Sequence, residues 1–248
     1  VTDAQWGNIK KYLDKTGRRR QTSLRSVWNA LMYLLKTGCQ WRMLPDNFPK
    51  WQTVYYYFRK WVEDEVLDRV LDMARAKVRV GQGQQARPTL GIMDSQSVRW
   101  GNNRSLKGYD GNKRVKGVKR HVVVDRNGFL VAVMVTVACI NDGKAALLLM
   151  RVLKDCYASI RTVLADGGYR GDIIAAVKSR FGYLLQVVMR SRKDGGDGFK
   201  PIHGRWVVER TFSWFDNDRR LCRNYELLME TAEEMTKLSA IKLLLNKI

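Results

Sequence analysis

The sequence predicts an α/β fold, in which a mixed five-stranded sheet with helices on both faces follows a small all-helical domain. Three observations predict it. Apolar side chains recur at helical spacing over residues 1 to about 75. A linker-like run of Gly and Gln follows at 80–85. Beyond it, three strand-like segments precede a region in which helices and strands alternate.

The helical region is placed at 1–80. We expect one helix over 3–13, a second from Thr22 or Ser23 to Gly38, and a third from Trp51 or Gln52 to Val70. Two amphipathic helices joined by a turn, in a basic chain, indicate a helix-turn-helix-like DNA-binding domain. The outward residues of the third helix are types that contact bases and phosphates: Gln52, Thr53, Tyr56, Arg59 and Lys60. The alternative is an ordinary helix pair with an aromatic core.

The second domain is placed at 88–248. Strands are expected over 90–94, 119–125, 129–138, 162–165 and 183–189. Helices are expected over 144–157, 172–181, 205–215 and 233–248. Asn127-Gly128 is typical of a hairpin turn between the second and third strands. This order predicts three antiparallel strands that continue into crossover-linked parallel strands.

Two of these strands end in an acid, Asp94 after one apolar run and Asp166 after another. A carboxylate at the end of a buried strand is costly unless it is paired. Strands in this order can lie side by side and end at the same edge, and two carboxylates there favour a hard cation such as Mg²⁺. The alternative for Asp94 is a turn cap.

Glu209 is a candidate third acid. It borders the apolar stripe of a helix, so it can reach the rim of the sheet. The alternative, which periodicity favours, is a surface ion pair with Arg205 four residues earlier. Asp142 is expected to cap the following helix, with a supporting role near a metal as the alternative. His121 lies within a strand and is expected to be structural.

The chain carries a net charge of +21, from 45 basic and 24 acidic residues. Such an excess favours a polyanionic partner, most plausibly nucleic acid. A membrane surface is the competing partner, but no basic amphipathic helix, long apolar run or leader supports it. The four scattered cysteines and two histidines make a zinc site improbable and fit reduced thiols of a cytoplasmic protein. The chain begins at Val1 without Met, which suggests that a few residues are missing.

The segment from Arg99 to Arg120 combines cations with Gly and Asn, which indicates a flexible phosphate-binding loop beside Asp94. Its candidate DNA ligands are Arg99, Arg104, Lys107, Lys113, Arg114, Lys116, Lys119 and Arg120. Trp100 and Tyr109 are weaker candidates for stacking on an unpaired base. The alternative is an ordinary solvated loop.

Several motifs together resemble the DDE transposases of bacterial insertion sequences, specifically the IS-five group of the IS-four/IS-five superfamily. The resemblance spans nearly the whole chain. The residues that carry it are Asp3–Trp6, Thr37–Pro45, Trp51–Val54, Tyr57-Phe58, Trp61, Met93–Ser97, Lys119–Asp125, Leu164–Asp166, Gly168-Tyr169 and Arg205–Arg210.

The resemblance implies a ribonuclease-H-like catalytic domain in which Asp94, Asp166 and Glu209 hold two Mg²⁺ or Mn²⁺ ions. It also implies cleavage of the element's ends, transfer of the freed 3′-hydroxyl to target DNA, and a homodimer on DNA without a membrane partner. Arg205 is a candidate phosphate ligand. The chain departs from the family's last motif at Ile202 and Asp216, where that motif has Tyr and Lys. Two alternatives remain: a catalytically silent DNA-binding derivative, and a ribonuclease-H-like nuclease without strand transfer.

Overall fold

The computed structural model describes residues 1–14, 17, 20–188 and 206–248. These residues form two compact units. Unit 1 comprises Val1–Ala86, Phe215–Arg223 and Glu234–Ile248, and unit 2 comprises Arg87–Trp214 and Asn224–Glu233. Segments near the C-terminus therefore contribute to both units.

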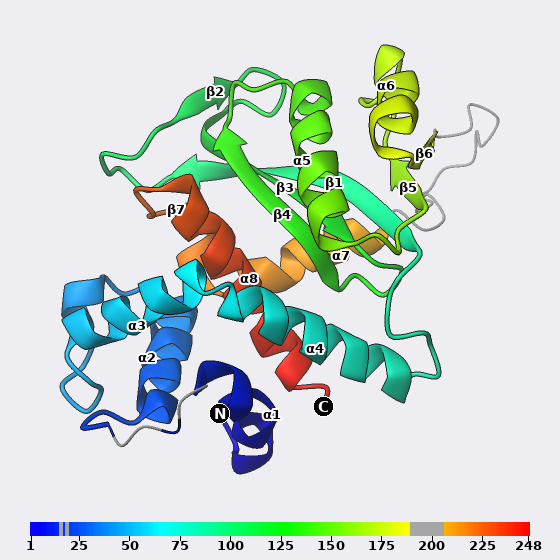
Figure 1. Cartoon of the computed structure of the whole chain (residues 1–248). Coiled ribbons are helices and arrows are strands. Elements are labelled where there is room, and N and C mark those ends of the chain that lie inside the picture. Colours follow the sequence, from blue (N-terminus) through cyan, green and yellow to red (C-terminus); the bar gives the residue numbers. More distant parts are fainter. Residues whose placement is uncertain (15–16, 18–19, 189–205) are drawn as a thin grey trace, which may run out of the picture. The chain divides into compact units, whose positions relative to one another are not determined.

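Unit 1 is helical (Figure 1). Its elements are α1 (Asp3–Leu13), α2 (Leu24–Thr37), η1 (Trp41–Met43), α3 (Trp51–Glu63), α4 (Val66–Gly81), η2 (Arg219–Leu221) and the later part of α8 (Met229–Leu245). The expected helix over 3–13 is confirmed. The second is also confirmed, and it ends at Gly38, whose φ of 70° lies in the left-handed region that favours glycine.

The third expected helix is two helices, so its prediction as a single element is wrong. Glu65 has a φ of 51°, which ends α3 and redirects the chain into α4. Hydrophobic spacing could not reveal this break, because Val62 and Val66 are both buried and lie four residues apart as in one continuous helix.

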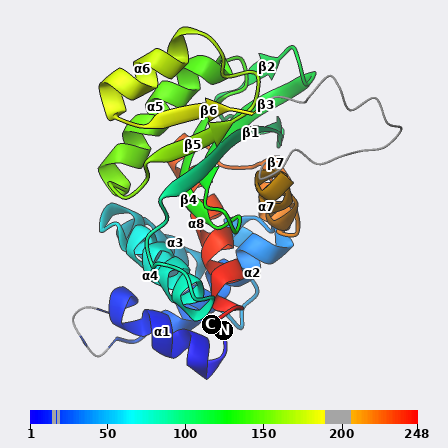
Figure 2. The ribbon, with the colours of Figure 1, turned by 90° about the vertical axis from the view of Figure 1, so that its right-hand side faces the viewer.

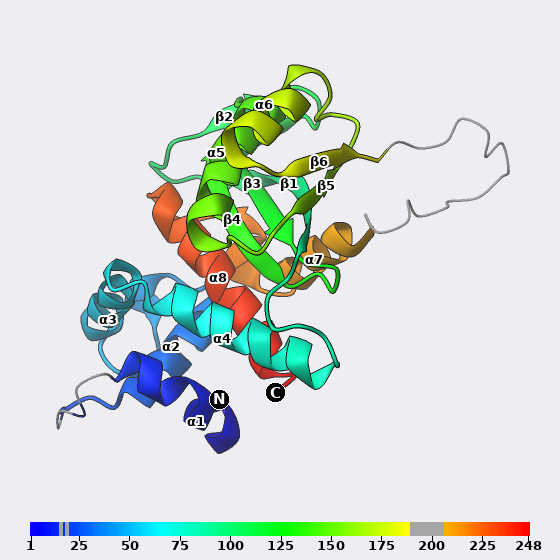
Figure 3. The same ribbon diagram turned by 45° about the vertical axis from the view of Figure 1, so that its right-hand side comes forward.

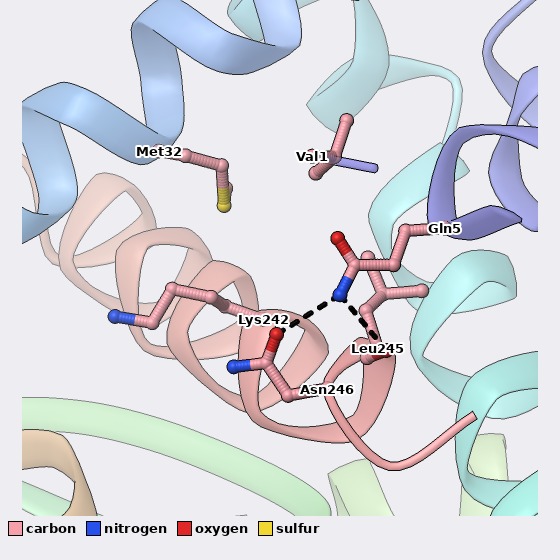
Figure 4. Close-up of a pocket in the computed structure, with 6 residues that line it drawn as sticks. All are labelled: Val1, Gln5, Met32, Lys242, Leu245 and Asn246. Atoms are coloured by element: carbon pink, nitrogen blue, oxygen red, sulfur yellow. Dashed lines mark hydrogen bonds between the residues drawn. The ribbon is translucent and has the colours of Figure 1, made fainter. Parts of the chain in front are cut away.

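The C-terminal part of α8 is tied to the helices of unit 1 by polar contacts. Lys237 Nζ lies 2.7 Å from Asp68 Oδ1. Gln5 Nε2 donates to the carbonyl of Leu245 and to Asn246 Oδ1, at 3.2 and 3.0 Å (Figure 4). These last contacts border a cavity of about 220 Å³ lined by Val1, Gln5, Met32, Lys242, Leu245 and Asn246.

Unit 2 is built on a mixed sheet. Its strands are β1 (Leu90–Trp100), β2 (Gly108–Asp110), β3 (Val115–Val124), β4 (Leu130–Val137), β5 (Thr162–Ala165), β6 (Leu184–Val187) and the end of β7 (Arg223–Asn224). The main strands run in the order β4-β3-β1-β5-β6. The first three are antiparallel, and β5 and β6 are parallel to β1. The expected α/β, ribonuclease-H-like arrangement with a mixed five-stranded sheet is confirmed. The short β2 and β7 are additions that the sequence did not predict.

Helices cover both faces of this sheet. The helices α5 (Asp142–Cys156) and α6 (Asp172–Phe181) lie on one face, and α7 (Trp206–Asp216) lies on the other (Figures 1 and 2). Met93, Val123 and Val163 belong to the core with α5 and α6. On the opposite face Val98 and Val118 pack with Ala232 of α8. Alternation along β1 therefore assigns Ser95 to the α5 face and Asp94 to the face of α7.

Candidate active site

Asp94 and Asp166 lie where β1 and β5 separate. The two strands are paired in parallel as far as Ile92 and Leu164, and each acid follows two residues later. The structure thus brings these two carboxylates opposite each other, and both side chains are partly exposed. Asp94 Oδ1 accepts the N–H of Ser95 at 2.7 Å, and Asp166 Oδ1 accepts the N–H of Gly168 at 2.8 Å.

Asp94 is not at the end of its strand, so that part of the prediction is wrong. β1 continues to Trp100 because its pairing with β3 extends to Arg99 and Gly117. What ends near Asp94 is the pairing with β5. Asp94 therefore lies on a strand that is still hydrogen-bonded to β3 at this residue, just beyond the end of the β1–β5 pairing, which gives its carboxylate a rigid support.

Tyr169 identifies a third acid near this pair. Burial raises the pKa of its hydroxyl, and the carboxylates of Asp142, Asp94 and Asp166 raise it further, while a hydrogen bond with Ser95 opposes the change. All three acids therefore act on one buried ring. The sequence did not predict that Asp142 and Tyr169 come together here, because the residues lie far apart along the chain.

Asp142 was expected to cap α5, and this prediction is wrong. Asn141 is the N-cap, and its Oδ1 accepts the N–H of Gly143 at 2.8 Å. Asp142 is the first residue of the helix, and its Oδ1 accepts the hydroxyl of Ser95 at 3.2 Å. The side chain is thus directed to β1, next to the residue that follows Asp94.

Glu209 lies on α7 and is exposed. Its helix covers the sheet face to which Asp94 is assigned, but no three acidic, histidine or cysteine side chains gather as a possible metal site within 1–14, 17, 20–188 and 206–248. Asp94 and Asp166 nevertheless fit Mg²⁺, which commonly takes one or two carboxylates and completes its shell with water and substrate phosphates. Arg205 and Ile202 lie outside the described residues.

The expected loop from Arg99 to Arg120 is strand over about half of its length, so the prediction of one continuous loop is wrong. Gly108–Asp110 is β2, and β3 begins at Val115. Figure 3 shows this region as a hairpin that extends from the sheet. Six of its cations are exposed: Arg99, Arg104, Lys107, Lys113, Arg114 and Lys116.

Lys119 and Arg120 differ from those six because they are buried in β3, each 5% exposed. Lys119 Nζ lies 3.1 Å from Asp142 Oδ1 and 3.5 Å from Asp110 Oδ2. Arg120 Nη1 donates to Gln96 Oε1 at 2.8 Å. Their positions inside the sheet correct the expectation that they belong to a phosphate-binding loop.

His121 is also buried in β3, as expected for a structural residue. Its Nε2 lies 2.9 Å from Thr136 Oγ1. Burial lowers the pKa of His121 to about 4; Asp142 raises it, and Lys119 and Lys113 lower it further. The ring is therefore neutral at physiological pH.

Two aromatic residues of the hairpin have different surroundings. Lys107 Nζ lies 3.9 Å from the centre of the Trp100 ring, and Lys116 Nζ lies 5.7 Å from it. The Trp100 indole also donates to the carbonyl of Asn103 at 3.0 Å. Tyr109 is 58% exposed. Of the two, Tyr109 presents the more open ring for stacking.

The second predicted DNA-binding surface is on α3. Gln52, Tyr56 and Lys60 are exposed, and Thr53 and Arg59 are partly exposed. Arg59 Nη2 lies 3.7 Å from Glu63 Oε1. The five residues therefore lie on the outer side of a helix whose Val54 and Phe58 are buried.

None of the helices in the described parts of the chain is long and apolar enough to span a membrane.

Family models match most of the chain. Residues 85–232 match the family described as "Transposase DDE domain". The chain belongs to this family. Residues 1–71 match a second family, described as "Putative transposase of IS4/5 family". The resemblance drawn from the motifs is thereby confirmed.

Two curated proteins are similar to this DDE-domain chain. A "Putative transposase for insertion sequence element IS402" from Burkholderia cepacia is 32% identical over 143 residues, which is 54% of this chain and 64% of that protein. An "Uncharacterized protein y4sN" from Sinorhizobium fredii is 31% identical over 74 residues, 29% of this chain and 59% of that protein. The chain thus spans less than two thirds of each relative.

Among solved structures, a piggyBac transposase synaptic complex with hairpin DNA aligns with a TM-score of 0.47 and 11% identity. The alignment covers 97% of this chain and 71% of that one.

Proposed function

We propose that this DDE-family chain is a DNA transposase that cleaves the ends of an insertion sequence and joins the freed 3′-hydroxyl to target DNA. The observation that carries the proposal is the placement of Asp94 and Asp166 opposite each other, where β1 leaves β5, in a chain that matches the DDE domain over both residues. The net charge of +21 supports DNA as the substrate.

Asp94, Asp166 and Glu209 are the proposed catalytic residues. Asp94 and Asp166 would hold divalent ions from two adjacent strands, and Glu209 would complete the set from α7. When bound, two Mg²⁺ or Mn²⁺ ions lower the pKa of the attacking water or 3′-hydroxyl and stabilise the leaving oxygen. The chain's own contribution is rigid placement, because strand pairing and backbone N–H donors orient the two aspartates.

Two surfaces are proposed to bind DNA. The exposed hairpin cations would bind phosphates beside Asp94, and Arg205 would add a further phosphate contact. The outer face of α3 would recognise the terminal inverted repeats through Gln52, Thr53, Tyr56, Arg59 and Lys60. Pairing of two ends in one reaction favours a homodimer on DNA.

The test uses a DNA duplex carrying the sequence that flanks the coding region, with cleaved and joined products separated by gel. Asp94→Asn, Asp166→Asn and Glu209→Gln should each reduce both products at least ~10³-fold and leave DNA binding intact, as loss of a group that acts in the transition state does. Asp172→Asn, at an exposed acid of α6, is the matched control. Normal cleavage by any of the three variants would remove that residue from the site.

Further outcomes separate the alternatives. Cleavage that persists in excess EDTA would rule out the divalent-ion scheme. Cleaved ends that never join would indicate a nuclease without strand transfer. Binding without cleavage by the wild-type chain, in Mg²⁺ and in Mn²⁺, would indicate a catalytically silent DNA-binding protein.

Recognition by α3 is best tested with point variants. Removal of residues 1–75 would also strip the partners of the Glu234–Ile248 segment, which belongs to the same compact unit. The exposed residues Gln52, Tyr56 and Lys60 are instead replaced together by Ala. Loss of the footprint on the inverted repeat, with binding to unrelated DNA retained, is the expected result. An unchanged footprint would contradict the role of this helix.

A further inference from the structure

The ammonium group of Lys119 lies inside unit 2 between two carboxylates. Its Nζ is 3.1 Å from Asp142 Oδ1 and 3.5 Å from Asp110 Oδ2. It also donates to the carbonyl of Ile140 at 3.1 Å. Three oxygen atoms thus surround an ammonium group, which carries three protons, in a place that water hardly reaches.

Each of the two carboxylates is joined to β1. Asp110 is 4% exposed, and its Oδ2 accepts the hydroxyl of Ser97 at 2.7 Å. Asp142 accepts the hydroxyl of Ser95 at 3.2 Å. Ser95 and Ser97 lie on the α5 face of β1, immediately after Asp94. Lys119 therefore holds the strand of Asp94 through two separate chains of contacts.

The same cluster fixes the base of the exposed hairpin. Asp110 Oδ1 accepts the backbone N–H groups of Asn112 and Lys113 at 3.0 and 3.2 Å. Lys113 Nζ donates a hydrogen bond to the carbonyl oxygen of Ser95 on β1 at 2.7 Å. Although burial raises the pKa of Asp110, hydrogen bonds from Ser97 and Lys113 and the charge of Lys119 lower it overall. Asp110 is thus a charged anchor for the turn between β2 and β3.

We propose that Lys119 is a positioning residue that holds Asp110 and Asp142 together, and so fixes both the strand of Asp94 and the base of the cationic hairpin. This inference rests on the proposed function, because it assigns Asp94 to the reacting site. Without the ammonium, the buried carboxylate of Asp110 and the partly exposed carboxylate of Asp142 would repel each other, and both attachments to β1 would loosen. Lys119 itself is buried in the sheet and does not contact DNA.

The test compares wild type with Lys119→Met, which keeps the length of the side chain and removes its charge. The single-turnover cleavage rate at saturating DNA should fall at least ~10-fold, as expected when catalytic groups are misplaced. The salt dependence of DNA affinity should stay unchanged, whereas removal of a phosphate ligand would lower the slope by about 0.9. Backbone amides of Asn112 and Lys113 should exchange with solvent faster.

The double variant Lys119→Met/Asp110→Asn is the rescue. It removes one of the two carboxylate charges that repel each other. The double variant should therefore cleave at least ~3-fold faster than Lys119→Met, because the effects of charges in contact are not additive. An unchanged rate in folded Lys119→Met, or a reduced salt slope, would overturn the proposal. If Lys119→Met does not fold, a double variant that folds supports the proposal, because one of the two opposed charges is gone, and a double variant that also fails to fold overturns it.

Failure of the proposed function is distinguishable from failure of this inference. If the wild-type chain cleaves no DNA, the transposase proposal fails. Amide exchange then decides the role of Lys119: faster exchange at Asn112 and Lys113 in Lys119→Met supports it, and unchanged exchange contradicts it.

Discussion

Two neighbouring groups of cations in unit 2 have opposite environments. The hairpin between Arg99 and Lys116 exposes its cations, whereas Lys119 and Arg120 are each 5% exposed within β3. Lys116 and Lys119 nevertheless lie close together in the sequence, on the same strand. The buried group has carboxylate and amide partners at 2.8 to 3.5 Å. The exposed group is the one proposed to bind DNA phosphates, and within the buried group Lys119 is proposed to position the site.

The difference shows that a cation's role depends on where along its strand it lies. Lys116, near the start of β3, is paired with Tyr109 of the short β2. Lys119 and Arg120 lie between β1 and β4, in the part of the sheet that helices cover, and are buried there.

The largest expected effect is on stability. Lys119→Met should lower the free energy of unfolding by about 3–5 kcal/mol, because it leaves the buried carboxylate of Asp110 without its cation. Lys116→Met, at an exposed position of the same strand, should change it by less than about 0.5 kcal/mol. Urea unfolding of both variants measures this. Equal losses of unfolding free energy in the two variants would show that the buried Lys119 contributes no more to stability than the exposed Lys116.

The second effect is a pH dependence of stability at His121. Its pKa is about 4 in the folded chain against 6.5 when unfolded. The unfolded chain therefore binds the proton first, so stability is complete above pH 6.5 and falls as the pH decreases toward 4. The loss amounts to about 3 kcal/mol at most.

This decline is measured by urea unfolding of the wild type and of His121→Gln between pH 4 and 7. At each pH the free energy of unfolding of His121→Gln is subtracted from that of the wild type. The carboxylates that titrate in the same range are present in both proteins, so the difference reports on the histidine. A difference that does not vary with pH would show that the folded chain protonates His121 as readily as the unfolded chain.

The third effect is on DNA affinity. Arg104→Gln and Lys116→Gln should each lower the slope of log affinity against log salt by about 0.9 for every duplex phosphate that the cation neutralises. Neither change should alter stability, because both side chains are exposed. Fluorescence anisotropy with labelled duplex over a series of salt concentrations measures the slopes. Wild-type slopes in both variants would exclude this part of the hairpin from the DNA interface.

The smallest expected effect concerns one hydrogen bond of the buried group. Ser97→Ala removes the hydroxyl that donates to Asp110 at 2.7 Å, and should cost about 1–3 kcal/mol because the acceptor is charged. Ser179→Ala, on the exposed side of α6, should cost less than about 0.5 kcal/mol. Thermal unfolding compares them, and similar shifts in Tm would argue against a fixed hydrogen bond at Asp110.

Much of the fold followed from local patterns. The helix over 3–13, the stop at Gly38, the hairpin at Asn127-Gly128 and the helix over 172–181 were all predicted, because each depends on residues close together in sequence. The break at Glu65 was missed, since a single left-handed residue leaves the hydrophobic spacing unchanged. The N-cap at Asn141 was missed because Asn and Asp next to each other are equally good caps.

Local patterns were enough to single out the acids of the site. Asp94 and Asp166 each follow an apolar run, and the motifs around them indicated the DDE family. Which cations are buried, and that Asp142 and Tyr169 lie near the pair, depends on the folded chain. The physical reason is that Lys119, Asp110 and Asp142 meet through strand register and helix packing, and such long-range pairing leaves no periodic signal in the sequence.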